Sequence, residues 1–185
     1  DLAYVTDAKE IPSSSLELLT GLHTLVLNGL RERSHPTHLS IPEAVEIIQE
    51  VQPRHAYLVH LATFKTRNSG SDTISQVTGI GAARRWIHKK FQQFSSQNDN
   101  RLLPFYLRFD YNICGIMRHY DVCAVLPGSD TSLKDFILVE AHFDTRCAGL
   151  CDTACLAEGM EDNGSGTALV MELARVLSKY TFKRS

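Results

Sequence analysis

Apolar runs and amphipathic segments alternate along the first 61 residues. A helix is predicted to begin at Ser40, because Ser40 and Glu43 form the signature of a capping box. Its apolar side chains recur at helical spacing, at Ala44, Ile47, Ile48 and Val51. The pattern as a whole predicts strands at residues 2–6, 23–27 and 56–59 and helices at residues 13–20 and 40–52. This alternating order favours parallel pairing of the three strands.

The residues from 62 onward show the same alternation with longer elements. Apolar side chains recur every three or four positions over residues 79–94, which predicts an amphipathic helix. Further patterns predict strands at residues 104–111, 120–126 and 136–141, a connection at residues 112–119 and a last helix at residues 165–180. The strand at 136–141 is expected to be buried. We therefore expect an α/β fold with three-layer sheet-and-helix packing, in which this part forms a partial mixed sheet of at least three strands.

Two motifs place metal-binding side chains beside the third of these strands. His142 and Asp144 directly follow the predicted strand, and Asp162 stands just before Gly164 at the start of the last helix. Open α/β sheets place their ligand sites at such strand ends. A neutral imidazole and a carboxylate oxygen together suit zinc or a similar divalent ion. The pattern therefore indicates a metal site that includes His142 and Asp162.

The stretches from His142 to Asp144 and from Glu161 to Gly166 resemble the zinc-dependent aminopeptidases of the di-zinc exopeptidase family. The resemblance extends through residues 67–73, 79–86 and 111–115, and so covers about residues 62–185. It implies that His142 binds zinc, that Asp162 bridges two zinc ions and that Asp144 is a supporting catalytic carboxylate. It also implies a peptide substrate whose N-terminal bond is hydrolysed by metal-activated water. The general-base glutamate and the further ligands of that family belong to later motifs that this chain does not contain.

A different resemblance covers about residues 1–61. Residues 4–8, residues 57–60 and the loop at residues 35–38 are similar to the C-terminal part of metallo-β-lactamase-fold hydrolases, particularly phosphodiesterases and ribonuclease Z-like enzymes. The resemblance implies that Asp7 bridges two metal ions, that His60 is a metal ligand and that His38 protonates the leaving group. The main ligand cluster of that family, His-x-His-x-Asp-His, occurs nowhere in the sequence.

The two resemblances meet near Leu61 without a Gly/Ser-rich or Pro-rich linker. We therefore expect a chimera of two incomplete domains, residues 1–61 and residues 62–185. The first is a short βαβαβ piece of metallo-β-lactamase type, and the second a partial sheet of zinc exopeptidase type. Three functions stay open: a zinc aminopeptidase completed by other residues, a phosphodiesterase, and a non-catalytic fragment that is inactive in isolation. The first residue is Asp1 and no signal-peptide pattern follows, which indicates a processed product or a fragment.

Charge and hydropathy narrow the expected partners. Nineteen basic residues against 21 acidic ones give a net charge of −2, which does not favour binding to nucleic acid. The basic cluster at residues 84–90 is interpreted as the solvated face of a helix rather than a nucleic-acid contact. No apolar run approaches the length of a membrane-spanning helix, so no membrane is expected.

Three of the five cysteines lie between the two zinc motifs, at positions 147, 151 and 155. They could form a further metal site, take part in a disulfide or remain free thiols. No Cys-x-x-Cys pair is present, which weighs against the metal site.

Overall fold

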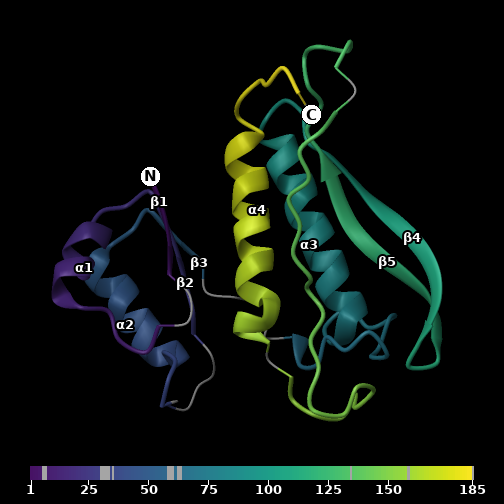
Figure 1. The fold of residues 1–185 in the computed structure, drawn as a ribbon, viewed down its shortest axis with the longest axis horizontal. Helices are drawn as coiled ribbons and strands as arrows, with labels where there is room; N and C mark the ends of the chain where they lie inside the picture. Colours follow the sequence, from purple (N-terminus) through teal and green to yellow (C-terminus); the bar gives the residue numbers. More distant parts are fainter. Residues whose placement is uncertain are drawn as a thin grey trace.

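A computed structural model describes residues 1–5, 8–29, 34, 36–57, 61, 64–133, 135–157 and 159–184. Its first part is a parallel sheet in the order β1 (Leu2–Val5), β2 (Thr24–Leu27), β3 (His55–Tyr57). Two helices, α1 (Ser13–Leu19) and α2 (Ile41–Val51), connect these strands (Figure 1). All four residues of the central strand β2 are buried, as expected for a strand with neighbours on both sides. The alternating elements and the parallel pairing predicted for this part are thus confirmed.

The start of α2 forms the predicted capping box. The backbone N–H of Glu43 donates to Ser40 Oγ at 3.4 Å, and the backbone N–H of Ser40 donates to Glu43 Oε2 at 2.6 Å. Lys9 Nζ donates to the other carboxylate oxygen of Glu43 at 2.6 Å. The hydrogen bond from Lys9, followed by those from Ser40, lowers the pKa of Glu43 to about 2. The carboxylate is therefore ionised at neutral pH and supports the positive end of the helix dipole.

Replacing Ser40 with alanine is expected to lower the free energy of unfolding by about 1 kcal/mol, because the N–H of Glu43 loses its acceptor. Urea unfolding measures the loss. Ser14→Ala, at an exposed position in α1, is the control and is expected to change stability by less than about 0.5 kcal/mol. The contribution of the Glu43 carboxylate to the free energy of unfolding is present above the pKa of the unfolded chain. It is lost as the pH falls through the folded-state pKa of about 2. Equal effects of the two variants at pH 7 would contradict a stabilising cap.

The second part is built on two helices and a hairpin. Helix α3 (Gly79–Ser96) and helix α4 (Gly166–Leu177) pack together, and β4 (Leu103–Ile113) and β5 (Ile116–Val125) form an antiparallel pair against α3. A kinked turn over Met160–Ser165, in which Asp162 and Asn163 have non-helical backbone angles, leads into α4. The core contains Phe64, Ala83, Ile87, Phe91, Phe94, Leu102 and Met171, among others. The predicted helix at 79–94 is confirmed, and the predicted last helix is shorter at both ends.

The connection between β4 and β5 differs from the prediction. Residues 112–119 were expected to form it, but the strands continue to a two-residue turn, Cys114–Gly115. Both residues have positive φ, 51° and 82°, as in the turns that match the twist of a hairpin. The prediction was wrong because Cys-Gly is not one of the usual turn pairs. His119, expected in the loop, lies in β5 and stacks on Phe109 at a centroid distance of 5.3 Å.

The buried strand predicted at residues 136–141 is absent, which is a second correction. This segment has no ladder partner among the described residues, and Figure 1 draws it as a coil. Phe136, Ile137 and Leu138 are 71%, 74% and 69% exposed. An apolar run becomes a buried strand only where a neighbour pairs with its backbone, and β4 and β5 pair with each other. The described residues therefore form separate sheets of three and two strands, and a mixed sheet of at least three strands is not found.

Helix α4 connects the two parts of the molecule, since it lies between the β1–β3 sheet and α3 (Figure 1). Thr24 Oγ1 in β2 donates to Glu172 Oε1 in α4 at 2.8 Å. Glu172 is 1% exposed and also accepts two hydrogen bonds from Arg175, at 2.7 and 2.6 Å. A buried carboxylate therefore joins the parallel sheet to the second core. No helix in the described ranges has the length and apolar character needed to cross a membrane.

Candidate metal centre

His142 lies between the two carboxylates that the sequence predicted for its site. Its Nε2 is 2.9 Å from Asp162 Oδ1, and its Nδ1 is 3.1 Å from Asp144 Oδ1. Asp162 belongs to the kinked turn before α4, whereas His142 and Asp144 lie on the segment that follows residues 136–141. The side chains of His142 and Asp162 are 54% and 89% exposed, so solvent and ligands can reach both. The predicted juxtaposition therefore forms even though the predicted strand does not.

Hydroxyl groups hold both ends of this arrangement. Ser69 Oγ donates to Asp144 Oδ2 at 3.2 Å, which orients the carboxylate that faces Nδ1. Thr167 Oγ1, in the first turn of α4, lies 3.1 Å from the backbone oxygen of His142 and 3.1 Å from that of Asn163. The histidine segment and the turn that carries Asp162 are thus fixed to the same helix end.

The buried side chain of Arg67 holds the backbone around the site, a role that the sequence did not predict. Its side chain is 0% exposed and donates to three backbone carbonyls, those of Leu61, Phe143 and Gly159, at 2.6, 2.7 and 3.0 Å. Burial lowers the pKa of Arg67 to about 10, and the charge of Asp144 acts in the opposite direction, so the guanidinium stays protonated at neutral pH. Arg67 therefore fixes residues on both sides of the loop between the two motifs. An arginine in an otherwise polar loop gave no sequence signal for this burial.

Thr145 and Gly159 close the two ends of that loop. Thr145 Oγ1 donates to the carbonyl of Ala157 at 2.9 Å and accepts from the backbone N–H of Arg67 at 3.0 Å. Gly159 has φ of +48°, and a Cβ at this position would collide with the side chain of Thr145. Glycine is therefore required where the chain turns towards Asp162.

Two disulfides organise the same loop. Cys147 is bonded to Cys155, and Cys114 in the β4–β5 turn is bonded to Cys151. Of the interpretations left open by the sequence, the disulfide is the one that the structure contains. Asn68 Nδ2 also donates to the carbonyl of Leu150 at 2.7 Å, so the loop is attached at several points. Cys123 is a free thiol whose pKa is raised by burial.

The donors fit zinc in kind but are too few for a complete site. His142 offers an imidazole nitrogen and Asp162 a carboxylate oxygen, and Asp144 on the second ring nitrogen matches the outer partner of a metal-bound histidine. If Nδ1–H of His142 donates to Asp144, the lone pair of Nε2 faces a carboxylate oxygen of Asp162. Both of these atoms are hydrogen-bond acceptors, so only a proton or a cation fits between them. Catalytic zinc usually has three protein ligands. Within the described ranges, no group of three or more His, Cys, Asp or Glu side chains is arranged to hold a metal ion.

The site residues predicted for the first part are only partly described. Asp7 and His60 lie outside the described residues. His38 precedes α2, where its Nδ1 is 2.7 Å from Thr37 Oγ1. Its role as an acid stays a prediction.

Two family models match the chain in separate places. Residues 121–185 match peptidase family M28, and residues 1–61 match the β-lactamase superfamily domain. A probable zinc metalloprotease of Leptosphaeria maculans is 29% identical over 147 residues, which are 74% of this chain and 33% of that protein. A probable zinc metalloprotease of Pyrenophora teres f. teres is 32% identical over 126 residues, 65% of this chain and 27% of the relative. The chain thus spans about a quarter to a third of the length of these curated relatives.

Among solved structures, a diphosphatase of the PhnP family is 41% identical over 30% of this chain and 22% of its own, with a TM-score of 0.30. Residues 121–185 are thus similar to peptidase family M28, and residues 1–61 to the β-lactamase superfamily domain.

Proposed function

We propose that residues 62–185 carry part of the zinc site of an aminopeptidase, in which His142 and Asp162 bind zinc and Asp144 orients His142. One observation carries this proposal: both ring nitrogens of His142 face carboxylates, at 2.9 and 3.1 Å. The matches to family M28 and to probable zinc metalloproteases support zinc and peptide hydrolysis as the chemistry. Cleavage at the peptide N-terminus is the finer part of the proposal.

Each residue has a separate task in this proposal. Asp144, held by Ser69, accepts a hydrogen bond from Nδ1–H of His142, which leaves the lone pair of Nε2 facing Asp162. Asp162, in the turn before α4, supplies the anionic oxygen. A zinc ion held by His142 and Asp162 would supply a Lewis acid for the scissile carbonyl and would activate water as the nucleophile. A general base must then pass the proton to the leaving amine.

The proposal includes the expectation that this chain alone is inactive. Two ligand side chains hold a divalent ion weakly, and the described residues offer no third ligand in the same group. Further ligands and the base would come from other residues of a complete metallopeptidase. We also propose that residues 1–61 and 62–185 derive from different domains, although Thr24 and Glu172 join them in the folded chain.

A phosphodiesterase is the second candidate, favoured by the match of residues 1–61 to the β-lactamase superfamily domain. Asp7 and His60 would be its metal ligands and His38 its acid. A third possibility is a non-catalytic chimera whose motifs record ancestry alone.

Zinc bound per chain in equilibrium dialysis against a fixed concentration of free zinc, measured beside hydrolysis of leucine p-nitroanilide and bis-p-nitrophenyl phosphate, separates these functions. We expect weakly held zinc that Asp162→Ala and His142→Ala each remove, with no turnover of either substrate. Glu50→Ala, at an exposed position of α2, is the matched control and is expected to leave zinc binding unchanged. Retention of the same zinc by Asp162→Ala and His142→Ala would overturn the assigned ligands. Turnover of the anilide would contradict the proposed inactivity, and turnover of the phosphodiester would favour the second candidate.

A further inference from the structure

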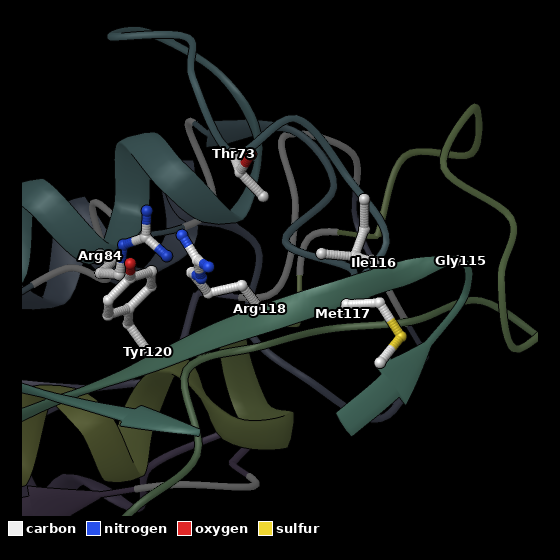
Figure 2. A pocket seen from close by; sticks show the side chains of 7 residues that line it. All are labelled: Thr73, Arg84, Gly115, Ile116, Met117, Arg118 and Tyr120. Carbon is white, nitrogen blue, oxygen red and sulfur yellow. The ribbon is translucent and has the colours of Figure 1, made fainter. Parts of the chain in front are cut away.

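A hollow of about 430 Å³ lies between the start of α3 and the β4–β5 turn, outside the set of residues around His142. Arg84, Arg118 and Tyr120 line one end and Ile116 the other, whereas the side chain of Met117 lies on the opposite side of β5 in Figure 2. Figure 2 shows the two guanidinium groups directed towards the same space, with the Tyr120 hydroxyl beside Arg84. The hollow therefore has a cationic end and an apolar end.

Arg84 is fixed in place without a carboxylate. Its guanidinium carbon lies 4.7 Å from the centroid of the Tyr120 ring and 6.0 Å from that of Tyr106, which is cation–π geometry. Burial and the neighbouring charge of Arg85 lower the pKa of Arg84. No ion pair of Arg84 occurs in the described part of the chain. The expected solvated basic face is found at Lys89, which is exposed, but not at Arg84, which packs against the hairpin and concentrates positive charge in the hollow.

Arg118 has only a distant carboxylate. Its Nε is 3.9 Å from Asp110 Oδ1, at the limit of an ion pair. Both oxygens of Asp110 already accept hydrogen bonds from Arg108, at 3.1 and 2.6 Å. The guanidinium of Arg118 thus keeps donors that can serve a ligand, and its side chain is 59% exposed.

We propose that this hollow binds an organic carboxylate with an apolar substituent. The carboxylate lies between Arg84 and Arg118, whose planar groups match its two oxygens, and the Tyr120 hydroxyl donates a further hydrogen bond. The substituent lies against Ile116. A few convergent polar groups beside an apolar wall are the usual composition of a small-molecule site. This binding requires no metal and is independent of the proposed peptidase function.

Calorimetric titration of the 185-residue chain with N-acetyl-leucine tests the proposal. We expect saturable binding that weakens at least about tenfold with N-acetyl-leucinamide, which lacks the charge. Arg118→Gln is expected to weaken binding by a similar factor, because one guanidinium contact is lost. Lys89→Gln removes the same charge from an exposed position of α3 and is expected to leave the affinity within about twofold.

Arg84→Lys is the second variant, since it keeps the charge but loses the planar donors, and at least about tenfold weaker binding is again expected. Circular dichroism confirms that each variant is folded. Absent binding of N-acetyl-leucine, equal affinity for its amide, or equal losses in Arg118→Gln and Lys89→Gln would each overturn the proposal. Inorganic phosphate that binds as tightly as N-acetyl-leucine would overturn the commitment to a carboxylate with an apolar substituent.

Discussion

Replacing Arg67 with methionine is expected to lower the free energy of unfolding by about 3–5 kcal/mol. Methionine keeps much of the volume but removes the donors to the carbonyls of Leu61, Phe143 and Gly159. Each carbonyl left unpaired in the interior costs about 1–3 kcal/mol. Urea unfolding followed by the fluorescence of Trp86, the one tryptophan of the chain, measures the loss. We also expect weaker zinc binding, because Phe143 lies between His142 and Asp144.

Arg101→Met is the matched control for Arg67→Met. Arg101 also donates to backbone carbonyls, those of Ser178 and Tyr180, but it does so at a partly exposed position. Water can replace the lost donors there, so a loss below about 1 kcal/mol is expected. Similar losses in the two variants would show that Arg67 does not fix the site in the way described here.

Replacing Glu172 with alanine is expected to cost about 3–5 kcal/mol, because it leaves the largely buried cation of Arg175 without its carboxylate. The hydrogen bond from Thr24 to the carboxylate is lost as well. Urea unfolding again gives the magnitude. Glu46→Ala, at an exposed position of α2, is the control and is expected to change stability by less than about 0.5 kcal/mol.

Thr24→Val distinguishes the two roles of Glu172. It removes the 2.8 Å hydrogen bond between β2 and α4 together with the 3.0 Å contact of the same hydroxyl with His23 Nδ1, and it leaves the pair with Arg175 intact. We expect a loss of about 1.5–3 kcal/mol, the usual contribution of a hydrogen bond to a charged group. If Thr24→Val leaves the free energy of unfolding unchanged while Glu172→Ala lowers it, the ion pair between Glu172 and Arg175 forms, but the hydrogen bond from β2 does not stabilise the contact between the two parts. Equal, small effects of Glu172→Ala and Glu46→Ala would contradict the buried pair itself.

The position of the disulfide-bonded loop bears directly on the metal centre. Residues 146–158 lie between His142 and Asp162 in the chain, and the Cys114–Cys151 bond attaches them to the β4–β5 turn. Such cross-links stabilise mainly by restricting the unfolded chain. Together with Arg67 and Thr145, they hold together two motifs separated by nearly 20 positions in sequence.

The elements that the sequence predicted correctly depend on local interactions. The α2 cap needs only Ser40 and Glu43, which are three residues apart, and the periodicity of α3 follows from one helix face packed on a core. The partners of His142 were also predicted, because both carboxylates belong to motifs whose residue types and spacing suggest a shared site.

The features that the sequence did not predict depend on distant parts of the chain. Residues 136–141 have the pattern of a strand, but a strand also needs a partner, and no described residue pairs with them. The burial of Arg67 depends on three carbonyls, the farthest of them 92 residues away, and the pairing of Cys114 with Cys151 spans 37 residues. By itself, the sequence determined the helices, the parallel β1–β3 sheet and the motifs that place His142 beside Asp144 and Asp162, because periodicity, caps and motifs act over a few residues. Only the tertiary structure decided which carbonyls, cysteines and strands meet, because those contacts depend on how the whole chain packs.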